Sequence, residues 1–242
     1  MIKYLGGEIY RLIHKRSIYL YFAALILGHV LIAYIRSGGF YEGSVVNDAI
    51  SLFNFMPPLA GGFLFAAVYT DDLNSKNLIS LVGFGLSKTK IVISKFILMA
   101  VLCAIAFALA PLLHCSVYAL LGWPAGANEW AIIYAASLKF LLMTVAFAVL
   151  SGIAVYGLQR ATFAIVLYIL LAFGVVSGLL SAAVKPFAPG IANYLMPGIS
   201  DRIMAGVIGG GPLFLPVIEY VVYVAAAAAL SALAFNKKEM EF

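Results

Sequence analysis

Long apolar runs separated by short polar stretches dominate the chain and predict its architecture. Two of them, 101–121 and 161–184, are almost continuously apolar and match the roughly 20 residues that a membrane-spanning helix needs. Spanning β-strands would instead alternate polar and apolar residues over about 10 positions. The pattern predicts spans at 17–35, 49–69, 91–121, 132–156, 161–184 and 216–235. We therefore expect an all-α, polytopic membrane bundle with six transmembrane helices.

The long third span is expected to tilt, to break near Pro111 or to project from the membrane. For the fourth span, a later beginning near Leu138 is an alternative. The first run exceeds the roughly 7–15 apolar residues of a signal peptide and no A-x-A site follows it, so we expect it to be retained.

The segment before the first span, 1–16, has an amphipathic pattern. Apolar residues recur in it at helical spacing: Ile2, Leu5, Ile9, Leu12 and Ile13. The basic residues of the same segment are available to anionic headgroups, which predicts an interfacial helix along the membrane surface. The alternative is a plain positively charged flank of the first span.

The connection at 185–215 is rich in Gly and Pro and yet stays apolar. An apolar loop is not expected to hang free in water. We expect it to re-enter the outer leaflet or to cap the bundle, where protein buries its irregular backbone.

Composition supports the membrane class. Hydrophobic residues make up 64% of the 242 residues and charged residues only 10%. In a typical soluble domain, about 45–50% of the residues are apolar and about 25% are charged. The composition therefore excludes a soluble globular protein and a disordered one. The net charge of +5 comes from 15 scattered Lys and Arg, which disfavours a nucleic-acid binder.

The distribution of basic residues predicts the orientation. With a cytoplasmic N-terminus, the inner side holds Lys3, Arg11, Lys15, Arg16, Lys76, Lys88, Lys90, Lys95, Arg160, Lys237 and Lys238. The outer side holds Arg36, Lys185 and Arg202. Lys and Arg are enriched in cytoplasmic loops. The excess of eleven basic residues on the inner side over three on the outer side therefore predicts that both termini are cytoplasmic. We expect a multi-pass protein of the cell (cytoplasmic) membrane.

The sequence offers no catalytic or metal-binding constellation. Ser151, Ser177 and Ser181 lie on predicted spans outside any motif of a serine nucleophile. None of the 3 histidines has an acidic residue at i+1 or i+4, as a helical metal site of the H-E-x-x-H kind needs. Residues 83–89 lack the glycines that a phosphate-binding loop places before its lysine. We expect no catalytic residue, metal or cofactor in this chain.

Ionisable residues inside spans are costly and indicate function by default. Four of them fall in the outer halves of their predicted spans: His29, His114, Lys139 and Glu219. One interpretation is a polar vestibule open to the outside. The alternative is that Lys139 and Glu219 reach the outer interface while the histidines bond to neighbouring helices. No carboxylate is predicted near the midplane, which disfavours proton-coupled transport.

Small residues recur in the fifth span. Gly174 and Gly178 form a G-x-x-x-G motif, and Ser177 and Ser181 repeat the spacing one face over. Such faces let helices approach closely. Both self-association and packing within the chain fit this pattern.

The segment after the second span, 68–97, is the most informative one. Asp71 and Asp72 follow the span directly, and either can cap a short helix at 73–81. Gly83 and Gly85 then break that helix. A short amphipathic helix between two spans on the cytoplasmic side suits docking to a soluble partner, whereas an ordinary charged connector is the alternative.

This segment resembles the permease subunits of the type-2 ABC exporter family, which includes drug, sodium and lantibiotic-immunity exporters. Those permeases carry an acidic residue after the second span, a coupling helix, a G-x-S-[RK] turn and a Lys that opens the third span. Asp71 or Asp72 matches the acidic position, which is more often Glu. The tetrapeptide at 85–88 matches the turn and Lys95 matches the final Lys. The interfacial helix, six spans, inner termini and apolar outer loop match the layout.

The resemblance implies a transport subunit that is not itself an enzyme. A dimer of a separate ABC ATPase, binding ATP and magnesium, would dock on the coupling segment at about 70–90. The contact residues implied are Asp71, Asp72, Leu73, Lys76, Leu78, Ser87 and Lys88. A second permease chain, identical or related, would complete the pathway for an amphipathic or hydrophobic solute, such as a peptide or an antimicrobial. A stand-alone carrier or channel without an ATPase is the alternative.

Overall fold

The computed structural model describes residues 2–35, 45–74, 77–188 and 190–237. This part of the chain is almost entirely helical, and no strand occurs in it. The elements are α1 (Ile2–Ile13), α2 (Arg16–Ile35), α3 (Val45–Asn54), the π-helix η2 (Pro57–Gly61), α4 (Gly62–Asn74), α5 (Asn77–Gly83), α6 (Lys88–Leu120), α7 (Ala127–Leu158), α8 (Ala161–Ala172), α9 (Val175–Val184), the 3₁₀-helix η3 (Ile191–Tyr194), α10 (Met196–Gly209) and α11 (Phe214–Lys237). The all-α expectation is confirmed for these residues.

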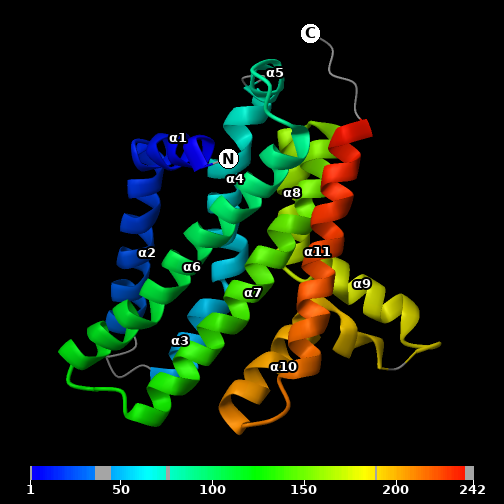
Figure 1. Ribbon diagram of the computed structural model, residues 1–242. Coiled ribbons are helices and arrows are strands. Elements are labelled where there is room, and N and C mark those ends of the chain that lie inside the picture. The colour runs from blue at the N-terminus through cyan, green and yellow to red at the C-terminus, as the bar shows by residue number, and fades with distance from the viewer. Residues whose placement is uncertain (1, 36–44, 75–76, 189, 238–242) are drawn as a thin grey trace.

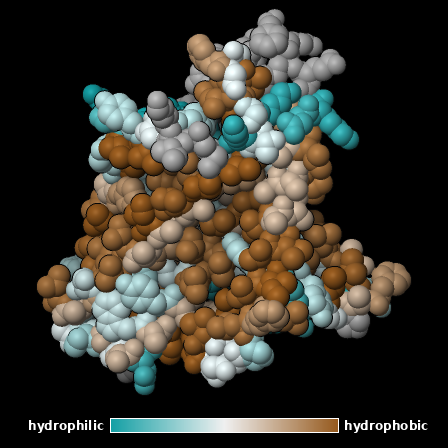
Figure 2. Space-filling model, in the orientation of Figure 1, coloured by the Kyte–Doolittle hydropathy of each residue, from teal (hydrophilic) through white to brown (hydrophobic). Residues whose placement is uncertain are grey.

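Five helical stretches of the described chain are long and apolar enough to cross a membrane, and a sixth is counted if the bent pair α8–α9 is one span. The helices form a bundle with α1 lying crosswise at one end and α5 standing beyond that end (Figure 1). Hydrophobic side chains cover the middle of the visible face, and hydrophilic ones gather towards the two ends (Figure 2). These features fit a membrane-embedded protein.

The second span, expected at 49–69, forms one helical stretch at Val45–Thr70, but its α-helical hydrogen-bond pattern is interrupted between Asn54 and Gly62. Pro57 and Pro58 have no N–H to donate, and the chain passes through the π-helical turn η2 here. Tyr168 of α8 donates a hydrogen bond of 2.8 Å to the Pro57 carbonyl. Gly61 lies so close to the same tyrosine that a Cβ there would overlap its hydroxyl. The α8 helix therefore supports this break from the side.

The third span stays continuous through Pro111 and does not break there. A proline frees the carbonyl four residues before it, in this case that of Phe107. Ser137 of α7 donates a hydrogen bond to this same carbonyl, so the helix continues at little cost. The α7 helix begins at Ala127, before both of the starts expected for it. It lies at the centre of the fold and contacts α3, α6, α8, α10 and α11.

The region expected as a fifth span followed by an irregular loop has a different shape. The stretch at 161–184, expected as one span, consists of two helices, because the chain bends by 62° between α8 and α9. Gly174 lies at the bend with φ of +73°, a left-handed conformation that favours glycine. The connection at 185–215 contains η3 and α10, and α10 packs against α7 and α11.

Candidate functional site

The segment expected to couple to an ATPase, which the structure describes at 70–74 and 77–90 and which we name the coupling segment, lies at the end of the bundle that also carries α1 and the end of α11 (Figure 1). Asp71, Asp72 and Leu73 lie in the last turns of α4. Neither aspartate therefore caps the short helix as expected, since that helix begins later, as α5. Lys76 lies outside the described residues.

The short helix α5 packs one side against the bundle and leads into an exposed tip. Leu78 is buried, and Leu81 and Val82 are half-buried against the hydrophobic core. Beyond them the Phe84 side chain is 86% exposed. The chain turns at Gly85, whose φ is +85° and whose N–H donates to the Val82 carbonyl at 2.9 Å. The tip is thus a hydrogen-bonded turn that presents an aromatic ring, a feature missed from the sequence although Phe84 stands between two glycines.

The beginning of α6 is braced by the end of α11. Ser87 is exposed and directly precedes α6. The Lys88 ammonium lies 5.5 Å from the centre of the Phe235 ring. Asn236 donates a hydrogen bond of 3.4 Å to the Thr89 hydroxyl. The turn after α5 is therefore held between two spans.

A buried ion pair lies at the base of the coupling segment. The Lys95 side chain of α6 is only 1% exposed, and its Nζ lies 2.8 Å from Glu8 Oε2 of α1. The same ammonium donates to the Val68 carbonyl of α4 at 3.4 Å. Arg11 of α1 adds a second cation 2.8 Å from Glu8. One lysine thus joins the crosswise helix α1 to the two helices that lead into and out of α5.

The charges around Glu8 set its protonation. Burial by itself raises the pKa of this carboxyl, because it disfavours the charged form. The charges and hydrogen bonds of Lys95 and Arg11 outweigh burial, so the pKa of Glu8 lies below its ordinary value. Glu8 is therefore ionised at neutral pH, and the ion pair is formed.

His29 and His114 are brought together by α2 and α6, with their ring centres 6.1 Å apart. His114 Nε2 donates to the Val45 carbonyl at 3.0 Å, which ties it to the start of α3. Beside them the buried Asp48 carboxylate accepts a hydrogen bond of 2.6 Å from the Tyr118 hydroxyl. Sequence reasoning missed Asp48, although it directly precedes the second span expected there.

Lys139 and Glu219 belong to a different group, which is built around α10. Lys139 Nζ lies 2.6 Å from Asp201 Oδ1, and Arg202 forms an ion pair with Glu219. Asp201 and Arg202 are adjacent on α10, so opposite charges from α7 and α11 hold this helix. The four residues considered for one vestibule therefore lie in two groups. Asp201 was missed because no helix is expected in this Gly- and Pro-rich region.

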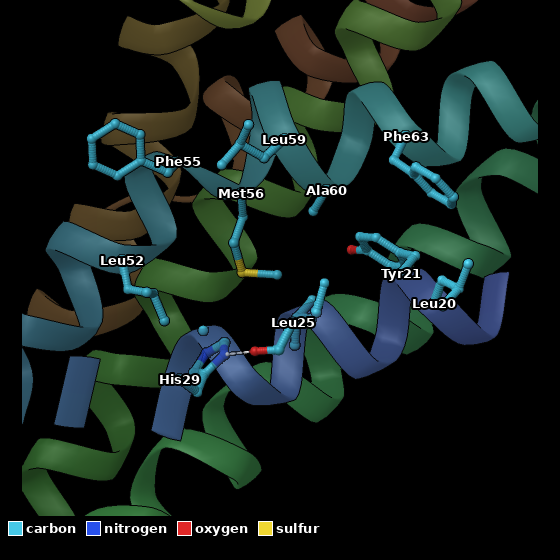
Figure 3. Close-up of a pocket in the computed structure, with 12 residues that line it drawn as sticks. Leu20, Tyr21, Leu25, His29, Leu52, Phe55, Met56, Leu59, Ala60 and Phe63 are labelled. Atoms are coloured by element: carbon cyan, nitrogen blue, oxygen red, sulfur yellow. Dashed lines mark hydrogen bonds between the residues drawn. The ribbon is translucent and has the colours of Figure 1, made fainter. Parts of the chain in front are cut away.

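The α2 groove, as we name the hollow between α2 and the broken second span, has a volume of about 570 Å³ (Figure 3). Ligand pockets typically have volumes of about 300–1,000 Å³. Twelve residues line it, and they are apolar apart from Tyr21 and His29. Met56 reaches into the space between these two side chains (Figure 3). The groove is therefore large enough for a ligand and suits an apolar one.

A smaller hollow of about 340 Å³ lies where the break in the second span meets the bend in the fifth. Pro57 and Pro58 line it on one side and Gly174 and Ser177 on the other. Irregular backbone at membrane depth is tolerated where it is buried in protein or lines a cavity.

The small residues of the fifth span do not share one helix. Gly174 precedes α9, and the Ser177 hydroxyl donates to its carbonyl at 3.0 Å. No residue of α9 is buried in the described chain, and the space beside Gly178 is open. Ser181 is half-buried. Packing of these residues against a second chain stays a prediction.

Comparison with known proteins gives no family for this chain. No family model matches it, and no curated protein matches it. Within the described residues, no three His, Cys, Asp or Glu side chains are grouped so that they could hold a metal ion.

Proposed function

We propose that this chain is the membrane-spanning permease subunit of an ATP-driven exporter of the type-2 ABC class. Two such chains form the pathway for an amphipathic or hydrophobic solute. A separate ATPase dimer, which binds ATP and magnesium, docks on the coupling segment. The end of the bundle with α1 and α5 faces the cytoplasm.

The position of α5 is the observation that carries this proposal. The short helix stands beyond the end of the bundle, where a soluble partner has access to it (Figure 1). Its Phe84 tip offers an exposed aromatic ring, and such rings are enriched at protein interfaces. Because α5 connects the second span to the third, a partner that moves it acts on two spans at once.

The ion pair at the base of α5 supports the same role. Lys95 ties α1, α4 and α6 together through Glu8 and the Val68 carbonyl. Displacement of α5 is thus passed to three helices rather than absorbed by a loose connector. This speaks against an ordinary charged connection between two spans.

The two interrupted spans support a transport pathway. Their breaks meet at the hollow lined by Pro57 and Gly174. A helix break is a place where two halves of a span can change their relative angle. Rocking of the spans between inward-open and outward-open states therefore has a structural basis at membrane depth.

Copurification with matched variants tests the docking surface. We would replace Phe84 with Glu at the α5 tip, and Phe187 with Glu as the control in the turn that follows α9, where it is 88% exposed. Both tagged chains are purified from native membranes in mild detergent, and ATPase per chain is measured. We expect the Phe84→Glu chain to lose most of the ATPase and the Phe187→Glu chain to keep it. Equal ATPase in both would contradict docking at α5.

A further inference from the structure

The α2 groove contains two buried polar atoms without a partner. Tyr21 is 9% exposed and His29 is 3% exposed. In the described part of the chain, neither the Tyr21 hydroxyl nor His29 Nε2 has a hydrogen-bond partner. A buried polar atom without a partner is unfavourable, and each such atom calls for an explanation. A ligand that enters the groove can supply a partner to one of these atoms, and His29 is the one that restricts its chemistry.

His29 shows which kind of group is missing. Its Nδ1 lies 2.8 Å from the Leu25 carbonyl oxygen, as the dashed line marks in Figure 3. A carbonyl only accepts hydrogen bonds, so Nδ1 carries the proton. The Nε2 of the neutral ring is then an acceptor that needs an O–H or N–H donor. The Tyr21 hydroxyl can donate or accept a hydrogen bond, so it does not restrict the ligand to a donor or to an acceptor.

The shape and charge of the groove narrow the choice further. Tyr21 and His29 are eight residues apart on α2, which is about 12 Å along the helix axis. The rest of the lining is apolar and contains no carboxylate that would stabilise an ammonium group. A long apolar body with a single neutral donor at one end fits this surface. A ligand with many polar groups would leave most of them unpartnered.

We propose that the α2 groove binds a single-chain amphiphile whose polar end is a hydroxyl group. The hydroxyl donates to His29 Nε2, and the hydrocarbon chain lies along α2 past Leu25 towards Tyr21. Both polar atoms are covered in the present conformation, so the lining has to shift as the ligand enters. Met56, an unbranched and adaptable side chain, is suited to this movement. The inference deepens the proposed function and rests on it for transport, whereas binding itself needs no ATPase.

Photolabelling of the full chain in lipid nanodiscs tests the proposal. The probe is 1-hexadecanol with a diazirine in its chain, and the labelled peptides are identified by mass spectrometry. Unlabelled 1-hexadecanol and its methyl ether, which has no donor, serve as competitors. We expect labelling of α2 and α3–α4, and at least about tenfold stronger competition by the alcohol, because a hydrogen-bonding site rejects an analogue without the group. In the His29→Phe variant, the alcohol and its methyl ether should compete with the probe equally well.

A groove-filling pair provides the control. Ala23 and Ala24 are adjacent and exposed on α2, but only Ala24 lines the groove. Ala24→Trp should reduce labelling at least about tenfold, as expected when the site volume is filled, and Ala23→Trp should not. The proposal would be overturned if labelling were spread evenly over the lipid-facing helices. It would also be overturned if the alcohol exceeded the ether as a competitor by the same factor in wild type and in His29→Phe. If the alcohol binds but no ATPase copurifies, the proposed exporter function is wrong and the proposed binding site is supported. If an ATPase copurifies but the alcohol does not bind, only the proposed binding site is wrong.

Discussion

Lys95 and Glu8 form an ion pair with 2.8 Å between Nζ and Oε2, although 87 residues separate them in the sequence. The pair fastens the crosswise helix α1 to the start of the third span. The same lysine reaches the Val68 carbonyl at the end of the second span. We therefore expect α1, α4 and α6 to move together when α5 is displaced.

Replacing Lys95 with Met should destabilise the protein by about 3 kcal/mol, because loss of one partner leaves a buried carboxylate uncompensated. Arg11 remains 2.8 Å from Glu8 and keeps the loss near the lower end of the usual range of about 3–5 kcal/mol. The free energy of unfolding is measured by denaturation in mixed micelles. Lys90→Met, at an exposed position of the same helix, should change it by less than about 0.5 kcal/mol. Equal effects of the two variants would contradict the role of Lys95.

The contribution of Glu8 to stability should depend on pH. Its pKa in the folded protein lies below the ordinary value of 4.5, because Lys95 and Arg11 favour the charged form. The stabilisation is therefore fully present above pH 4.5 and is lost as the pH falls below it, through the folded-state pKa. The difference in unfolding free energy between wild type and Glu8→Gln, measured against pH, checks this. A difference that shrinks well above pH 4.5 would be inconsistent with a lowered pKa.

The break in the second span should distinguish two adjacent glycines. A Cβ at Gly61 would overlap the Tyr168 hydroxyl, whereas a Cβ at Gly62 would make ordinary contact with the same ring, 3.6 Å from its nearest atom. We expect Gly61→Ala to be destabilising by about 1–3 kcal/mol, the usual range for overpacking. Gly62→Ala should be neutral or slightly stabilising, because alanine favours helix. Thermal unfolding of both variants measures this, and similar behaviour would rule out the close approach to Tyr168.

Alanine substitutions at Gly174 and Gly178, at and after the bend in the fifth span, should also differ in their effect on stability. Gly174 has a φ of +73°, so Gly174→Ala places a side chain in the left-handed region at a cost of about 1–2 kcal/mol. Gly178 lies within α9 with open space beside it, so Gly178→Ala should not destabilise the isolated chain. Thermal unfolding of the monomer measures both. Equal destabilisation would mean that Gly178 is packed as tightly as the motif predicts for a helix interface.

The long apolar helices could be predicted from the sequence because a spanning helix satisfies its own backbone hydrogen bonds, so apolar runs of sufficient length indicate it locally. Where a helix breaks depends on distant partners. Pro111 does not interrupt the third span, since Ser137 of α7 bonds to the Phe107 carbonyl that this proline frees. Pro57 does lie at a break, which Tyr168 supports from 111 residues away. No local pattern distinguishes these two prolines.

The candidate site shows the same limit. The motif after the second span indicates Lys95, but its partner Glu8 follows from how α1 folds back on the bundle. Lys139 and Glu219 were recognised as unusual in spans, yet their partners lie on α10, a helix hidden in a Gly- and Pro-rich region. Charges that are costly in a bilayer can be found in a sequence, whereas their pairing depends on tertiary structure.

Purification of the tagged chain from native membranes, followed by transport assays in vesicles, tests the proposed function most directly. We expect a soluble ATPase to copurify in stoichiometric amount and solute movement to require ATP. Charge reversal at Asp71 and Asp72 should release the ATPase and abolish transport. A chain that purifies without any ATPase and still moves a solute across the vesicle membrane without ATP would contradict the proposed function.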